Sequence, residues 1–134
     1  MQYSGIQEYR KGIGSSILLT VLTCGIYNLF WQNHQIKTIN LLLEKEVLSF
    51  WRWFFLTLIT CGLYHIYHEY LMGKYIVEIQ YKINKPAPST NLPVIALILS
   101  IVGLPFITDA IEQKELNEII DYIVETKTSS GQKI

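Results

Sequence analysis

The chain has 134 residues, of which 50% are hydrophobic and 16% are charged, against roughly 25% charged residues in an ordinary soluble domain. Eleven basic and eleven acidic residues give a formal net charge of zero, which excludes the positive footprint of a nucleic-acid-binding protein. The length corresponds to one domain, and the composition favours a membrane protein.

Three apolar runs dominate the chain, at residues 12–31, 51–70 and 92–108. A helix needs about 20 apolar residues to cross the hydrocarbon core of a bilayer, so these runs predict three transmembrane helices in an integral membrane protein. The first run follows Arg10 and Lys11 as in a signal peptide, but its length and the lack of a cleavage motif predict a retained span. Re-entrant hairpins at the membrane surface are the alternative, favoured by Gly103 and Pro105 in the short third run.

Each apolar run is followed by a segment with apolar residues three or four positions apart, which indicates an amphipathic helix. These amphipathic helices are predicted at residues 32–46, 71–84 and 109–127, and residues 128–134 form a polar tail. The predicted fold is therefore all-α, with one span and one amphipathic arm written three times in a single membrane domain.

The repeat can be seen directly in the amino-acid sequence. Shifting the chain by 37 residues lays TCGIY (23–27) on TCGLY (60–64), and a weaker third copy follows when Gly62 is laid on Gly103. Repeats of this period indicate repeated supersecondary units.

The doubled pentapeptide is interpreted as a helix-packing notch. Small residues let transmembrane helices approach closely, and on one continuous helix the Thr, Cys and Tyr side chains of each copy share a face. The predicted packing residues are Thr20, Thr23, Cys24, Gly25 and Tyr27 in the first copy and Thr57, Thr60, Cys61, Gly62 and Tyr64 in the second.

Tryptophan is enriched at membrane interfaces, and long basic side chains reach from the apolar layer toward headgroups. The three tryptophans lie where the first run ends and the second begins. We therefore predict that one interface is anchored by Trp31, Trp51, Arg52 and Trp53.

Chemical roles for these residues have less support in the sequence than the packing interpretation. A disulfide between Cys24 and Cys61, or a zinc site from Cys61, His65 and His68, is conceivable from spacing, but no second ligand cluster accompanies them. The carboxylates nearest the runs, Glu69, Asp109 and Glu112, are expected to be solvated at the span ends. With no recognisable catalytic motif, we predict no enzyme activity, no metal and no cofactor.

Two segments, LTCGIYNLFW and ITCGLYHIYHEY, together with the later AIEQKELNEI (110–119), resemble the bacterial membrane family known as domain of unknown function 4234. The resemblance covers residues 15–125, and the chain departs from the family pattern at His65 and His68. It implies an integral protein of the bacterial inner (cytoplasmic) membrane and supplies no activity.

The predicted function is a structural or interaction role, in which the protein assembles in the lipid bilayer with itself or with a membrane protein partner. The alternatives are an oligomeric pore or transporter, and an immunity-type protein that binds through its C-terminal helix. Nucleic acid is not expected as a partner. The basic residues divide five against six between the two predicted sides, so orientation stays open.

Overall fold

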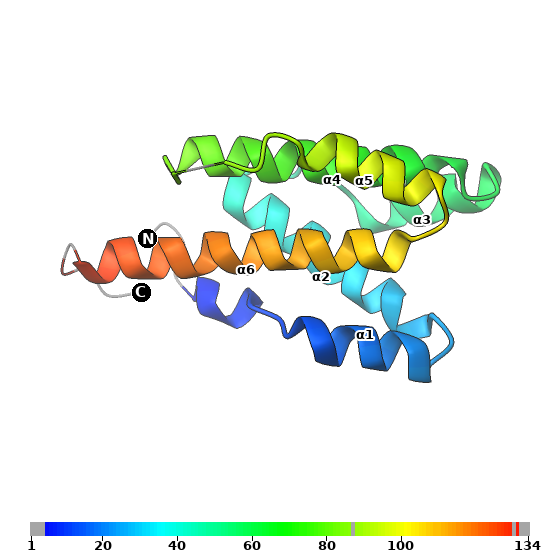
Figure 1. The fold of residues 1–134 in the computed structure, drawn as a ribbon, viewed down its shortest axis with the longest axis horizontal. Coiled ribbons are helices and arrows are strands. Elements are labelled where there is room, and N and C mark those ends of the chain that lie inside the picture. Colours follow the sequence, from blue (N-terminus) through cyan, green and yellow to red (C-terminus); the bar gives the residue numbers. More distant parts are fainter. Residues whose placement is uncertain (1–4, 87, 130, 132–134) are drawn as a thin grey trace.

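The computed structural model describes residues 5–86, 88–129 and 131, and within these residues the chain forms six α-helices and one short 3-10 helix (Figure 1). The 3-10 helix covers Ile6–Tyr9. The α-helices are α1 (Ile13–Leu22), α2 (Ile26–Leu43), α3 (Phe50–Ile59), α4 (Leu63–Lys82), α5 (Leu92–Ile101) and α6 (Pro105–Ser129).

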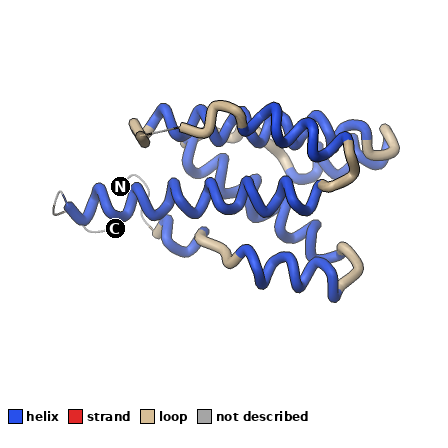
Figure 2. The backbone as a smooth tube through the Cα atoms, in the orientation of Figure 1, coloured by secondary structure: helices blue, strands red, loops and turns tan. Residues whose placement is uncertain are grey.

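The helices pair into three hairpins, α1–α2, α3–α4 and α5–α6, each with a short first helix and a longer second helix. All three hairpin turns lie at the same end of the molecule, on the right of Figures 1 and 2, and the last turns of α4 and α6 lie at the opposite end. We call these ends the turn end and the distal end.

The hairpins are arranged around an approximate threefold axis. The long helices α2, α4 and α6 contact one another, and each short helix packs against two long ones: α1 on α2 and α6, α3 on α2 and α4, and α5 on α4 and α6. At Gly73 the contact between α4 and α5 is so close that a Cβ atom would lie 2.8 Å from Pro93 Cα. The contact pattern agrees with a structural unit written three times.

The prediction of three transmembrane helices, and with it of an integral membrane fold, is wrong. Across the described residues, no helix combines the length and the apolar character that crossing a membrane requires. The reason is that each apolar run bends back at its middle, so that its second half begins the helix that continues as the amphipathic arm. The predicted spans 12–31, 51–70 and 92–108 are thus divided by the three hairpin turns.

The first turn is built by the repeated pentapeptide. Cys24 and Gly25 have positive φ angles of 53° and 91°, and the Gly25 N–H donates to Thr20 O at 2.8 Å while the Cys24 N–H donates to Val21 O at 3.2 Å. This pair of hydrogen bonds is the Schellman arrangement that ends helices.

The Thr23 hydroxyl completes the turn, because it accepts from the Tyr27 N–H at 2.9 Å and donates to Leu19 O at 2.7 Å. The second copy repeats these interactions: Gly62 N–H donates to Thr57 O at 2.8 Å, and the Thr60 hydroxyl accepts from Tyr64 N–H at 2.9 Å. The doubled pentapeptide is therefore a doubled turn, and no single helix face carries it.

The apolar core lies toward the distal end. It is built from the positions that the periodicity of the amphipathic segments placed on one face, including Ile36, Ile39, Leu42, Met72, Ile76, Ile79, Leu116, Ile119 and Ile120. Of the predicted polar tail, residues 128 and 129 continue α6, and residues 130 and 132–134 lie outside the described residues.

Candidate functional site

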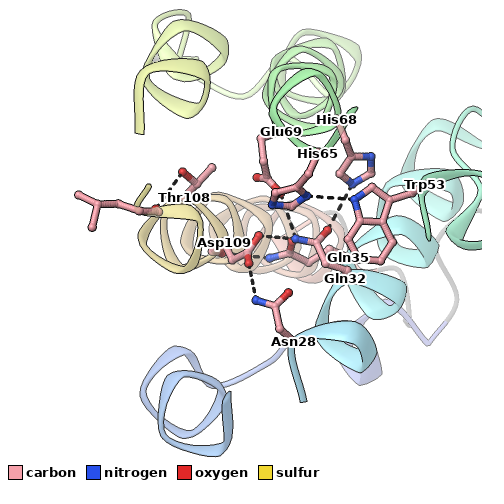
Figure 3. Close-up of polar contacts among 10 residues, drawn as sticks. Asn28, Gln32, Gln35, Trp53, His65, His68, Glu69, Thr108 and Asp109 are labelled. Carbon is pink, nitrogen blue, oxygen red and sulfur yellow. Dashed lines mark hydrogen bonds and ion pairs between the residues drawn. The ribbon is translucent and has the colours of Figure 1, made fainter. Parts of the chain in front are cut away.

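The centre of the molecule near the turn end is filled by polar side chains that all three long helices contribute (Figure 3). These side chains are fully or almost fully buried, although buried polar groups cost free energy unless they are hydrogen-bonded. The polar cluster consists of Gln32 and Gln35 from α2, His68 and Glu69 from α4, and Asp109, Glu112 and Gln113 from α6, with Asn28 and His65 at its edge.

Gln32 joins the three helices. Its side-chain Nε2 donates to Glu69 Oε1 at 3.0 Å and also to Asp109 Oδ1, and its Oε1 lies 3.3 Å from His68 Nε2. One carboxamide thus contacts residues of α4 and α6 at once.

Asp109 accepts a second hydrogen bond, from Asn28 Nδ2 to its Oδ2 at 2.9 Å, and its backbone carbonyl accepts from Gln35 Nε2 at 3.0 Å. Burial raises the pKa of Asp109 well above its usual value, and the neighbouring Glu69 raises that pKa further, whereas the hydrogen bond from Asn28 lowers it.

His65 faces Glu69 as a neutral donor. Its Nδ1 accepts from Trp53 Nε1 at 3.0 Å, which leaves the ring proton on Nε2, 3.5 Å from Glu69 Oε1. Burial lowers the pKa of His65 to about 4, and burial together with the positive charges of His65 and Arg52 lowers the pKa of His68 to about 3. Neither histidine therefore brings a positive charge to the cluster at neutral pH.

Glu112 is the least satisfied member. Within the described residues, neither of its carboxylate oxygens has a hydrogen-bond donor, and Glu69 Oε2 has none either, although all these atoms are buried. Burial raises the pKa of Glu69 and of Glu112 well above the usual value. The neighbouring Glu112 raises the pKa of Glu69 further, whereas Glu69 as a hydrogen-bond partner lowers the pKa of Glu112 and the charge of Asp109 raises it. One oxygen from each of Glu69, Asp109 and Glu112 lies within 4.8 Å of the other two.

A groove of about 500 Å³ lies between the first two hairpins, next to this cluster. Asn28 and His65 are part of its wall, and each of them contacts one of the buried carboxylates. The remaining lining residues are mainly apolar or small: Thr20, Gly25, Leu29, Trp53, Phe54, Thr57, Leu58, Gly62 and Phe106.

The predicted packing residues fall at the turns and along this groove. Thr20, Gly25, Thr57 and Gly62 line the groove from two hairpins. Thr23 and Thr60 cap the turns, Tyr27 lies under the Lys11 ammonium, and Tyr64 packs against the apolar core. Cys24 and Cys61 are exposed, free thiols, and nothing in the structure explains why cysteine occupies these two positions.

The predicted interface anchors separate into two groups. Trp31 is fully buried and donates to Gln113 Oε1 at 2.9 Å, and Trp53 is buried against His65 and His68. These two tryptophans therefore do not face outward as predicted, because their runs fold back. Trp51 is exposed, and the Arg52 guanidinium donates to Val47 O at 3.1 Å.

The expectation that Glu69, Asp109 and Glu112 are solvated is wrong, since all three are completely buried. One signal in the sequence pointed to the cluster: the same 37-residue shift that aligns the pentapeptides lays Gln32 on Glu69. Around a threefold axis, equivalent positions of successive units come together at the centre, which is where these two side chains meet. Cys61, His65 and His68, which were the alternative zinc ligands, do not form a group that could hold a metal ion among the described residues.

A family model for the domain of unknown function DUF4234 matches residues 48–114, which is half of the chain. The protein belongs to the DUF4234 family. The matched part of this DUF4234 chain includes α3, α4, α5 and the first turns of α6, and so contains all three buried carboxylates. No curated protein and no solved structure gives a significant match, so the family supplies no activity for the site.

Proposed function

We propose that the protein is a membrane-surface protein that inserts its three hairpin turns into one leaflet of a lipid bilayer. The observation that carries this proposal is the inverted distribution of side chains at the turn end. There the interior is polar, and the exterior exposes large apolar side chains of every hairpin, including Val21, Leu22, Ile26, Phe30, Leu58, Ile59, Leu63, Ile98, Ile101 and Val102. A contiguous exposed apolar surface marks a contact with a membrane or a partner.

Lipid is the better occupant because the apolar surface carries no charge on any hairpin. The chain has no Asp, Glu, Lys or Arg at residues 12–36, 53–68 and 86–108. Each of these segments follows a basic residue, namely Lys11, Arg52 or Lys85, and basic residues at the edge of an inserted segment favour anionic headgroups.

The dimensions of the short helices also fit one leaflet. Helices α1, α3 and α5 have 10 residues each, which corresponds to about 15 Å at 1.5 Å per residue. The hydrocarbon core is about 30 Å thick, so each hairpin reaches about the middle of the bilayer.

The backbone of the turns suits an apolar medium, in which every unpaired N–H is costly. In the first turn, the N–H groups of residues 23–28 all donate within the turn, five to carbonyls and one to the Thr23 hydroxyl. The second turn satisfies residues 60–65 in the same way. Such turns lose little when they leave water.

Vesicle flotation tests the insertion. Purified protein is mixed with vesicles of phosphatidylcholine and phosphatidylglycerol, and the variant Leu22→Glu/Ile59→Glu/Ile101→Glu places one carboxylate near each turn, at positions that are 68%, 75% and 62% exposed. The matched control is Tyr81→Glu at the distal end, where the side chain is 60% exposed. We expect the wild type and the control to float and the triple variant to stay in the dense fractions; equal flotation of all three would refute the proposal.

Sidedness separates insertion into one leaflet from full crossing. Single cysteines introduced by Glu8→Cys, Lys45→Cys or Lys85→Cys in a Cys24→Ser/Cys61→Ser background are treated with a membrane-impermeant maleimide. All three labels are expected to react from the same side of the vesicle, because these positions lie away from the turns. Reaction of residues 8 and 45 from opposite sides would contradict the hairpin arrangement.

Assembly with a second copy or another membrane protein, and residence in the bacterial inner membrane, stay predictions. Docking through the C-terminal helix is the least supported of the alternatives, because Leu116, Ile119 and Ile120 of α6 are already buried within the chain.

A further inference from the structure

We propose that the carboxylates of Glu69, Asp109 and Glu112 bind one divalent cation of the oxygen-preferring class, Mg²⁺, Mn²⁺ or Ca²⁺. The proposal does not rest on membrane insertion, because it follows from the geometry of the polar cluster alone. Its starting point is the proximity of three fully buried carboxylates, contributed by two different hairpins.

The hydrogen-bond donors of the cluster are unevenly distributed. Gln32 donates to Asp109 and to Oε1 of Glu69, Asn28 donates to Asp109, and the His65 Nε2–H faces Oε1 of Glu69. Donors of this kind favour the ionised carboxylate. Glu69 Oε2 and both oxygens of Glu112 are buried without any donor from the described residues. Some carboxylate oxygens of the cluster therefore have donors, and three buried acceptors have none among the described residues.

The chain supplies no positive charge to balance them. Among the described residues, no Lys or Arg forms an ion pair with any of the three carboxylates, and His65 is the neutral tautomer because its Nδ1 accepts a hydrogen bond from Trp53. A single proton on Glu112 would satisfy its own oxygen and one acceptor, and would leave a third buried oxygen unpaired. One divalent cation bound between Glu69, Asp109 and Glu112 would contact an oxygen of each residue and offset two negative charges at once.

The donor set selects the class of cation. The candidate ligands are carboxylate oxygens only, which suit Mg²⁺, Ca²⁺ and Mn²⁺. His65 Nε2 is not available as a ligand, because Nδ1 accepts the Trp53 hydrogen bond and Nε2 therefore carries the proton. The His65 N–H instead orients Glu69, as the groups behind a metal ligand commonly do.

The groove lies beside the cluster, with Asn28 and His65 in its wall, and water entering from it would complete the coordination. Because Glu69 belongs to the second hairpin and Asp109 and Glu112 to the third, the bound cation would link α4 to α6. Gln32 extends this link to the first hairpin. Cation binding should therefore stabilise the arrangement of all three hairpins.

The test uses the full chain in mild detergent, treated with EDTA and dialysed. Mn²⁺ is the probe, since the loss of its free electron paramagnetic resonance signal reports binding, and Mg²⁺ and Ca²⁺ are added as competitors. The wild type is compared with Glu112→Gln and with the matched control Glu115→Gln. Glu115 is a buried acid on the same helix, but it accepts hydrogen bonds from Gln80 and Ser89 and lies outside the cluster.

We expect one Mn²⁺ per chain, displaced by Mg²⁺ or Ca²⁺, with an affinity that falls at least about tenfold in Glu112→Gln and is unchanged in Glu115→Gln. Added cation should raise the unfolding temperature of the wild type and of the control, and not that of Glu112→Gln. If Glu112→Gln does not fold, Glu112→Asp keeps the charge but withdraws it by one methylene, and should bind more weakly than the wild type.

Three outcomes would overturn the proposal. Folded wild-type protein that retains no Mn²⁺ at roughly 1 mM, the weak end of the range for protein Ca²⁺ sites, would mean that protons neutralise the cluster. Equal affinity in the wild type and the Glu112 variants would place the ion elsewhere. Binding of Zn²⁺ without Mn²⁺, Mg²⁺ or Ca²⁺ would contradict the assignment of the cation class.

Discussion

Replacing the turn glycines by alanine should distinguish hairpins from continuous helices in the apolar runs. The sign of the change in the free energy of unfolding differs between the two arrangements. Gly25 and Gly62 have φ angles of 91° and 92°, and a Cβ added to either would have nothing within 4 Å. The substitutions Gly25→Ala and Gly62→Ala therefore introduce no steric overlap with other residues. What they test is the backbone conformation alone.

A non-glycine residue in the left-handed region costs roughly 1–2 kcal/mol, so each variant should lower the free energy of unfolding by about that amount. In an uninterrupted helix the same change would stabilise by roughly 0.5–1 kcal/mol, since glycine is a poor helix residue. Gly14→Ala in α1 provides the matched control, because Gly14 is exposed and its added Cβ also meets nothing.

Unfolding of the purified chain in mild detergent, followed by circular dichroism, measures these differences. A loss of 1 kcal/mol corresponds to a shift of roughly 2–8 °C in Tm for domains of this size range. We expect Gly25→Ala and Gly62→Ala to unfold at lower temperature than the wild type and Gly14→Ala at equal or higher temperature. A rise in stability for the two turn variants would refute the hairpin interpretation.

Three further predictions follow from the turns, the helix contacts and the buried carboxylates. Thr23→Val and Thr60→Val should each lose about 1 kcal/mol, the usual cost of removing a capping hydroxyl. Thr57→Val should lose nothing, because the buried Thr57 hydroxyl has no hydrogen-bond partner in the part of the chain that the structure describes. Denaturant titration compares the stability of the three variants. Gly73→Ala should cost roughly 1–3 kcal/mol through overpacking, since its Cβ would approach the Pro93 backbone to 2.8 Å, and an unchanged denaturation midpoint would contradict the close contact of α4 and α5. In EDTA, wild-type stability should fall relative to Glu112→Gln as pH rises above the ordinary glutamate value. The reason is that burial raises the pKa of Glu112 in the folded state, so that the unfolded chain releases this proton first; parallel pH profiles of the two proteins would be the contrary result.

Much of the fold could be predicted from the chain, because repetition and periodicity are local properties of a sequence. The three-unit repeat and the buried faces of the amphipathic segments follow from spacing alone, as at Ile36, Met72 and Leu116. The break within each apolar run does not follow from hydropathy, because an uninterrupted apolar run of about 20 residues also has the length of a membrane span. A Thr-Cys-Gly step at mid-run is also compatible with a Schellman turn, in which Cys24 occupies the left-handed C′ position that glycine usually takes and Gly25 follows at C″ with a φ of 91°.

The candidate site was hidden for a different reason. Glu69 and Asp109 follow directly after uncharged segments, so a span model assigns them to the water interface. Folding the run back moves the same positions to the centre of the three long helices. Whether an acid at the end of an apolar run is solvated or buried is therefore decided by tertiary arrangement, and local sequence does not contain that information.

The threefold arrangement also explains how a polar centre arises in so apolar a chain. A residue that faces the axis in one hairpin is opposed by the equivalent residue of the next, so Gln32 and Glu69, which are 37 positions apart, meet at 3.0 Å. When Gly62 is aligned with Gly103, the position equivalent to Glu69 in the third hairpin is Ala110, a small residue. The acids of α6 lie on either side of Ala110, at Asp109 and Glu112. The three diverged copies thus bring one amide and three carboxylates together. Three identical copies would bring three identical side chains together. The divergence of the three copies, rather than their similarity, creates the only group of three potential metal ligands that the described residues contain.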